Sequence, residues 1–370
     1  MSFDSQAVAT KAAGVPYRRK IQRLTPRLLE WYSIHARDLP WRHTRDPYAI
    51  WISEIMLQQT QVTTVIPYWE RWMKSLPDVV KLARARPEKI LKLWEGLGYY
   101  SRARNLQKAA QMIVEKHEGN FLRDPEALRG LPGIGRYTAG AVCSIAFDLP
   151  EPILDGNVTR VLARLFAIID EVNSAAANRN LWALAQEFVN TTDKCGTLNQ
   201  ALMEIGATIC KPRQPSCDKC PLKRSCAAKK LNNVEAFPNK PKPRKSKECH
   251  WRVLVLNHHG RYLIRQRPTG GINGGLWEFP TRESTSRQSP SEWQTELVGC
   301  EVGHPRRFAK LSHTITNKRI RVEVWLAETN GHKPIGQWIK WSQLRELPLA
   351  GVHRKILALM NEEIADKARV

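Results

Sequence analysis

Residues 131–139 read L-P-G-I-G-R-Y-T-A and lie directly before a segment with helical apolar spacing. This pattern predicts a tight, glycine-rich turn that opens a helix. Glycine lets the backbone approach a ligand closely, and a helix N-terminus presents unpaired N–H groups to an anion. We therefore expect Gly133 and Gly135 to turn backbone amides towards a phosphate, although an ordinary turn between two helices would have a similar sequence.

The chain around this turn is predicted to be helical from Leu24 to about Met203. Helical apolar spacing recurs over residues 50–72, 103–117, 139–147, 158–169, 181–189 and 199–209. Breaks are expected at Gly96-Leu97-Gly98, Pro132-Gly133 and Asp155-Gly156. The pattern indicates an all-α domain over residues 24–230, with its hairpin at about 125–145 and an N-terminal extension over 1–23.

Four cysteines follow the last predicted helix with the spacing C-x6-C-x2-C-x5-C, namely Cys210, Cys217, Cys220 and Cys226. Four thiolates so close together can hold an iron–sulfur cube or a zinc ion. Structural zinc sites more often combine two close pairs, or cysteine with histidine. Here there is one close pair and no histidine, so we predict a [4Fe–4S] cluster in the loop 210–226, with zinc as the alternative.

The formal net charge is +23, from 58 Lys and Arg against 35 Asp and Glu. Such an excess favours a polyanionic partner, most simply DNA or RNA. The other four cysteines are scattered, which suits a reducing compartment. The first 20 residues have no signal-peptide core, and no apolar run reaches the roughly 18 residues of a membrane span. We expect a monomeric cytoplasmic protein, associated with the nucleoid and not with a membrane.

The composition changes after the cysteine loop. Within residues 231–248, lysine and arginine at 240, 242, 244, 245 and 247 are interspersed with Pro241 and Pro243, which is typical of an extended linker. Strands are predicted at 252–256, 261–265 and 320–327, with a turn at His259-Gly260. A separate α+β domain is therefore expected over residues 249–370.

Several sequence motifs resemble those of the helix-hairpin-helix DNA glycosylase superfamily. They are L-P-G-I-G-x-x-T-A, L-D-G-N-V-x-R-V and the cysteine loop. Four further words resemble its adenine DNA glycosylases, the MutY family: D-L-P-W-R (38–42), S-E-I-M-L-Q-Q-T (53–60), G-L-G-Y-Y-S-R-A-R-N-L (96–106) and N-Q-A-L-M-E-I-G (199–206). The resemblance implies base excision repair. The enzyme would hydrolyse the N-glycosidic bond of adenine opposite 8-oxoguanine or guanine in duplex DNA.

Glu54 is the predicted proton donor. Trp51 and Leu57 lie three residues away on either side, so the carboxyl shares an apolar helix face. Desolvation there should raise its pKa towards neutrality, which suits a general acid. A salt bridge to a nearby basic residue is the alternative. The resemblance implies that Glu54 protonates adenine N7 and then activates water.

Asp155 precedes a predicted helix and could serve only as its N-cap. The resemblance instead implies a catalytic aspartate that stabilises the sugar cation, with Asn157 orienting the carboxylate. Tyr137 occupies the hairpin position where bifunctional relatives such as endonuclease III have lysine. A phenol cannot form an imine, so the enzyme should be monofunctional. A bifunctional glycosylase/AP lyase and a non-catalytic iron–sulfur DNA-binding protein are the alternative functions.

The resemblance also implies the residues that contact DNA. Those expected to line the adenine pocket are Arg37, Trp41, Arg42, Leu57 and Gln200. Gln59 and Tyr99 are expected to wedge into the duplex, beside the hairpin glycines Gly133 and Gly135. Each of these side chains could equally be a packing residue.

The C-terminal domain is expected to be Nudix-like, through G-G-L-W-E-F-P at 274–280. Its 8-oxoguanine-recognition residues would be Ser312 and His313, with Leu311 in place of the usual aromatic residue. An ordinary loop is the alternative there. The glutamate-rich metal helix of Nudix hydrolases is replaced by T-R-E-S-T-S (281–286), which disfavours pyrophosphohydrolase activity.

Overall fold

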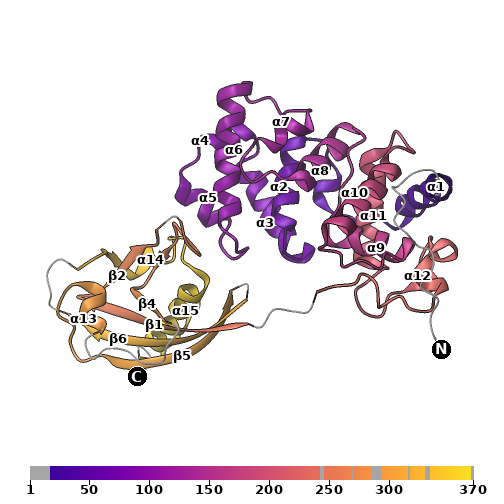
Figure 1. Ribbon diagram of the computed structural model, residues 1–370. Helices are drawn as coiled ribbons and strands as arrows, with labels where there is room; N and C mark the ends of the chain where they lie inside the picture. The colour runs from indigo at the N-terminus through magenta and orange to yellow at the C-terminus, as the bar shows by residue number, and fades with distance from the viewer. Residues whose placement is uncertain are drawn as a thin grey trace. The chain divides into compact units, whose positions relative to one another are not determined.

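The computed structural model describes residues 17–241, 246–268, 270–284, 293–315, 317–329 and 334–367. The chain forms two compact units (Figure 1). The first comprises Met1–Ala83 and Lys108–Lys242, and the second Arg84–Gln107 and Pro243–Val370. The middle of the predicted linker, 242–245, lies outside the described residues, as does most of the predicted N-terminal extension.

The first unit is helical, as predicted. Its helices are α1 (Arg18–His35), α2 (Pro47–Leu57), α3 (Val62–Ser75), α4 (Val79–Arg84), α7 (Pro125–Arg129), α8 (Arg136–Phe147), α9 (Gly156–Phe166), α10 (Ala175–Val189), α11 (Cys195–Thr208) and α12 (Ala227–Lys230). Short 3-10 turns lie at η1 (Pro40–Arg42), η2 (Cys217–Lys219) and η3 (Lys223–Ser225). Helix α5 (Pro87–Leu93) lies in the second unit, and α6 (Ser101–His117) begins in the second unit and ends in the first.

One predicted helix was wrong. Residues 50–72 form two helices, α2 and α3, because the chain leaves the helical conformation at Gln58. Gln59 has a φ of 58°, a left-handed conformation that an α-helix cannot contain. The break lies at the rim of the pocket described below.

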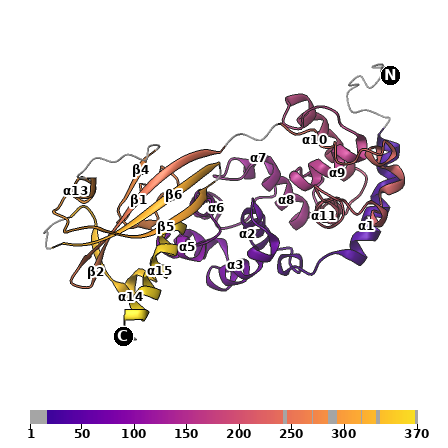
Figure 2. The ribbon, with the colours of Figure 1, turned by 90° about the horizontal axis from the view of Figure 1, so that it is seen from below.

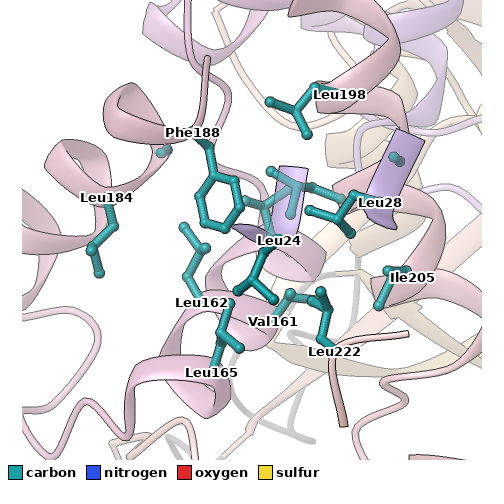
Figure 3. Packing of buried hydrophobic residues seen from close by; sticks show 14 of the residues in the cluster. Leu24, Leu28, Val161, Leu162, Leu165, Leu184, Phe188, Leu198, Ile205 and Leu222 are labelled. Carbon is teal, nitrogen blue, oxygen red and sulfur yellow. The ribbon is translucent and has the colours of Figure 1, made fainter. Parts of the chain in front are cut away.

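The core of the first unit joins α1, α9, α10 and α11 (Figure 3). Leu24 and Leu28 of α1 pack against Leu162 of α9 and Phe188 of α10, all at most 1% exposed. Leu222, from the cysteine loop, belongs to the same cluster. Each such side chain stabilises the fold by roughly 1.5–3 kcal/mol, so the loop is anchored to the helices by apolar packing as well as by its cysteines.

The second unit contains a mixed sheet in the order β3-β2-β1-β6-β5, with β4 beside β1 and β7 beside β2. The strands are β1 (Lys247–His258), β2 (Arg261–Gln266), β3 (Trp277–Glu278), β4 (Thr281–Ser284), β5 (Arg306–Ile315), β6 (Lys318–Glu328) and β7 (Gln337–Lys340). β1 and β6 are parallel over their whole paired length, and β5 and β6 form an antiparallel hairpin (Figure 2). The three predicted strands are confirmed.

The two faces of this sheet are covered differently. On one face, Trp251 and Val253 of β1 pack with Val322 of β6 and with Ile356 of helix α15 (Gly351–Lys367). On the other, Leu254 packs near Trp293 of helix α13 (Trp293–Val298). The short helix α14 (Trp341–Leu344) follows β7. Among the described residues, no helix is both long and apolar enough to cross a bilayer.

Candidate active site

A pocket of about 480 Å³ in the first unit brings together residues from α2, α8, α9 and α11. Glu54, Tyr137, Asp155 and Asn157 all line it. So do the predicted adenine-pocket residues Arg37, Trp41, Arg42, Leu57 and Gln200, and the predicted wedge Gln59. Residues up to 163 positions apart in the sequence therefore meet in one cavity.

Glu54 is buried, with 4% of its surface exposed. The Tyr137 hydroxyl donates a 2.6 Å hydrogen bond to its Oε2. Burial raises the pKa of Glu54 to about 7, against the smaller lowering effect of the Tyr137 hydrogen bond. The nearby Asp155 carboxylate raises it further. A large fraction of Glu54 is therefore protonated at neutral pH, as a proton donor requires.

Asp155 is the N-cap of α9 and also faces the pocket. It accepts hydrogen bonds from the Val158 backbone N–H at 2.7 Å and from Asn157 Nδ2 at 2.9 Å. Burial raises its pKa, while these two bonds oppose the rise. The capping role and a role in the pocket are thus compatible, because the bonds that hold the carboxyl also favour its ionised form.

Arg160 was not singled out from the sequence, yet it completes the Asp155 network. Its Nη2 donates to Asn157 Oδ1 at 2.8 Å and to the Gly206 carbonyl at 2.7 Å, and its Nε donates to the Cys210 carbonyl at 2.6 Å. A Cβ on Gly206 would lie 2.6 Å from the Asn157 Cβ, so only glycine fits between α11 and the start of α9. The arginine in L-D-G-N-V-x-R was the available signal.

Glu204 is the second residue that sequence reasoning missed. Its fully buried carboxylate accepts from Arg37 Nε at 2.7 Å, Arg37 Nη2 at 2.9 Å, the Arg37 backbone N–H at 3.1 Å and Arg42 Nη2 at 2.7 Å. Burial alone would raise the pKa of Glu204, but the two arginines lower it to about 2. Four bonds fill the acceptor capacity of a carboxylate, so Glu204 fixes Arg37 and Arg42 in the pocket wall. An acid inside the apolar helix 199–209 was the signal.

Gln200 is held by Tyr32, whose hydroxyl donates to Gln200 Oε1 at 3.2 Å. Arg42 lies over the Tyr32 ring, with its guanidinium carbon 5.2 Å from the ring centroid. Trp41 is buried and packs edge-on against Trp69 at 6.1 Å between centroids. Packing and pocket-lining roles therefore coincide in these residues.

The hairpin runs from α7 to α8. Gly133 has a φ of 79°, which favours glycine, and Gly135 is the N-cap of α8 without a side-chain cap. A Cβ on Gly135 would meet nothing within 4 Å. The first N–H groups of α8 thus lie behind open space that a phosphate can occupy.

Gln59 and Tyr99 share an unusual backbone conformation. Their φ angles are 58° and 48°, and both side chains are exposed, Tyr99 to 43%. Left-handed conformations of residues other than glycine are uncommon and concentrate at functional sites. In the second unit, Tyr99 and His313 line the same cavity of about 590 Å³.

The cysteine loop presents four partly buried thiols, Cys210, Cys217, Cys220 and Cys226. Burial, together with the three neighbouring thiols, raises the pKa of Cys220 to about 12. Arg164 donates to Cys210 Sγ at 3.4 Å. Within the described ranges, no three His, Cys, Asp or Glu side chains are spaced to hold a single metal ion.

The predicted lesion-recognition residues lie on strand β5 and not in a loop. Leu311 is partly buried and packs against the core between the sheet and α15. Ser312 and His313 leave the strand on opposite faces, because alternate residues of a strand do so. β4 occupies Thr281–Ser284, and residues 285–292 lie outside the described residues.

Comparisons with known proteins agree with this architecture. Residues 52–187 match the HhH-GPD family, described as "HhH-GPD superfamily base excision DNA repair protein", and residues 252–359 match the NUDIX domain. A thermostable thymine-DNA glycosylase of solved structure is 30% identical, with a TM-score of 0.51 over 58% of this chain and 99% of that one.

Two curated relatives match most of the chain. An "Adenine DNA glycosylase" of Rattus norvegicus is 35% identical over 90% of this chain and 77% of its own length. One of Buchnera aphidicola is 39% identical over 90% of this chain and 97% of its own length. With the helical unit, its two-carboxylate pocket and a Nudix-like unit in one polypeptide, the chain belongs to the adenine DNA glycosylase family of base excision DNA repair enzymes.

Proposed function

We propose that this protein removes adenine paired with 8-oxoguanine, or with guanine, from duplex DNA by hydrolysing the N-glycosidic bond. One observation carries the proposal: a single pocket holds one carboxyl whose pKa burial raises to about 7, Glu54, and a second carboxyl, Asp155, held by two hydrogen bonds. The adenine DNA glycosylases to which the chain is similar support the choice of base.

The two carboxyls have complementary tasks. Adenine is a poor leaving group until it is protonated, and its departure leaves positive charge on the deoxyribose. Glu54 donates its proton to N7 of the extruded adenine, and the Asp155 carboxylate stabilises the sugar cation. General acid catalysis alone gives about 10²–10⁴-fold acceleration, so the remainder comes largely from prearranged charge. Glu54, then ionised, accepts a proton from the attacking water.

Tyr137 supports hydrolysis without strand cleavage. Its hydroxyl is committed to Glu54 at 2.6 Å and its pKa is raised well above the usual range by burial. A neutral phenol neither attacks the sugar nor forms an imine. Borohydride should therefore trap little covalent enzyme–DNA adduct. Efficient trapping would favour the bifunctional lyase alternative.

The four cysteines suit a [4Fe–4S] cluster. A bound cluster would cross-link the loop and so have a structural role. The chain's own residues would then present Lys211, Arg213 and Arg224 on the exposed side of that loop, where they can contact DNA phosphates. Lys223 lies beside them and donates to the Asp218 carbonyl.

Opposite-base selection is assigned to the Nudix-like unit. His313 lines a cavity with Tyr99, and Ser312 is exposed on the other face of β5. A wedge side chain and a ring with hydrogen-bonding nitrogens are suitable groups for examining an opened base pair.

The decisive experiment measures base release from four duplexes with A opposite 8-oxoguanine, guanine, thymine or cytosine, followed by alkali cleavage. Release from the first two, and little from the others, is expected. Asp155→Asn keeps the size of the side chain but removes its charge, and should abolish release without abolishing DNA binding. If Asp155→Asn releases adenine at the wild-type rate, the catalytic assignment is wrong.

A further inference from the structure

Strand β5 divides its side chains between two environments. Leu311, His313 and Ile315 turn towards the face that α15 covers, and Leu311 and Ile315 contact its core. Lys310, Ser312 and Thr314 are exposed on the other face. Lys310 and Ser312 border a groove of about 550 Å³ that takes no part in the proposed cleavage of the N-glycosidic bond.

The face of the sheet opposite α15 is only partly covered, because the helix that packs on it, α13, is short. Helix α13 and its cluster lie over Leu254, Leu256 and Ala327, near one end of β1 and β6. Towards the other end, the same face carries polar side chains and borders the groove. The groove therefore has a floor of paired strands, β1, β6 and β5, which lie side by side in Figure 2.

Strand register orders the groove's side chains into three rows. Across β5, β6 and β1 the rows are Lys310–Glu323–Arg252, Ser312–Arg321–His250 and Thr314–Arg319–Glu248. Successive rows are two residues apart, or about 6.6 Å at 3.3 Å per residue. We call these nine residues the basic sheet face.

The charge of the basic sheet face is positive. Four cations, on Lys310, Arg252, Arg319 and Arg321, oppose two carboxylates. Arg321 pairs with Glu248, and Arg252 lies 3.7 Å from Glu323. Within the described part of the chain, Lys310 and Arg319 have no salt-bridge partner. Two uncompensated cations thus flank a row that ends in a serine hydroxyl.

We propose that the basic sheet face binds the sugar–phosphate backbone of the DNA duplex. Lysine, arginine, serine and threonine side chains are the usual donors to phosphate oxygens. Lys310 and Arg319 form no salt bridge with another described residue, so they give up none when a phosphate binds them. His313, on the opposite face of the same strand, stays available to a base. The inference rests on the proposed function only in that both concern the same DNA.

The test removes the positive charges of Lys310 and Arg319. The full-length variant Lys310→Gln/Arg319→Gln is compared with wild type and with Arg261→Gln/Lys340→Gln. That control removes one lysine and one arginine, both exposed, from β2 and β7 at another part of the same sheet. Affinity for an undamaged duplex is measured by fluorescence anisotropy from low to high salt.

Each lost phosphate contact should lower the slope of log affinity against log salt by about 1. The double variant should therefore lose about 2 from the slope and bind more weakly, equally for all sequences. The control should behave as wild type. Equal slopes and affinities for all three proteins would overturn the inference. The same result is expected if the face binds an acidic protein instead of DNA.

Base release by the wild-type protein is followed separately with A opposite 8-oxoguanine. Its failure would contradict the proposed function, whereas the salt slopes would still decide the inference. Both substituted residues are exposed on strands, so melting temperatures close to that of wild type are expected. A charge-reversed pair, Lys310→Glu/Arg319→Glu, should weaken binding further than the neutral pair; binding no weaker than the neutral pair's would also overturn the inference.

Discussion

Two buried glutamates, Glu54 and Glu204, line the active-site pocket, and their carboxyl groups differ in pKa. Glu54 receives one hydrogen bond from a phenol, and its pKa is about 7. Glu204 receives four bonds from Arg37 and Arg42, and its pKa is about 2. Burial acts in the same direction on both, so the partners decide the difference.

The two glutamates therefore have different roles in one cavity: Glu54 serves the chemistry and Glu204 the structure. A carboxyl without a cation can hold and release a proton near neutral pH, as the reaction requires. A carboxylate saturated by two guanidinium groups stays ionised and keeps those groups in place. Substituting each glutamate by glutamine, which has nearly the same shape, should therefore give contrasting results.

The largest expected effect is on the rate of base release. Glu54→Gln removes the transferable proton but keeps the side chain's size, so the single-turnover rate should fall by about 10²–10⁴-fold. Rapid-quench assays on a duplex with A opposite 8-oxoguanine measure it. A rate within threefold of wild type would show that another group supplies the proton.

Glu204→Gln should act mainly on stability. Lowering the pKa of Glu204 from 4.5 to about 2 stabilises the folded state by about 3 kcal/mol at 1.36 kcal/mol per unit. That stability is present above pH 4.5 and is lost as the pH falls towards 2. Urea denaturation should show a loss of about 3 kcal/mol at both pH 8 and pH 5. Unchanged unfolding midpoints would mean that the arginine pairs contribute nothing.

Glu54→Gln should have the opposite effect on stability. The pKa of Glu54 is raised by burial from 4.5 to about 7, so the folded state loses stability as the pH rises through this interval. The variant should be more stable than wild type by up to about 3 kcal/mol at pH 8 and by less than about 1 kcal/mol at pH 5. A gain that does not depend on pH would argue against a buried, titrating carboxyl.

Tyr137→Phe should produce the smallest change. The Tyr137 hydrogen bond lowers the pKa of Glu54, so its removal should raise that pKa above 7. In the wild type, the rate should decline as the pH rises through about 7. In the variant this alkaline limb should move to higher pH. A shift to lower pH would contradict the donor role of the phenol.

The sequence predicted the environment of Glu54 better than that of Glu204. Glu54 stands among apolar residues three positions away, so its burial follows from local spacing. Glu204 meets Arg37 and Arg42 across 167 and 162 residues of chain, and no local pattern encodes such a pair. Its position in an apolar helix signalled a buried acid but not its partners.

Backbone conformation limited the prediction elsewhere. Residues 58–61 read Q-Q-T-Q and include no glycine or proline, so the apolar spacing on either side of them was joined into one predicted helix, whereas the left-handed Gln59 separates α2 from α3. The segment around Ser312 has few apolar residues, which obscured a strand. Pairing of nine residues of β5 with β6 defines that strand, and this pairing places Ser312 and His313 on opposite faces.

The position of Arg160 has a consequence for biosynthesis. Its guanidinium holds Asn157 to carbonyl groups of Gly206 and Cys210, which lie about 50 residues later in the chain. A nascent polypeptide that has emerged only as far as α10 already contains every catalytic side chain named above. It lacks the two carbonyl groups that accept from Arg160, so the network that holds Asn157 is completed only after translation has passed Cys210.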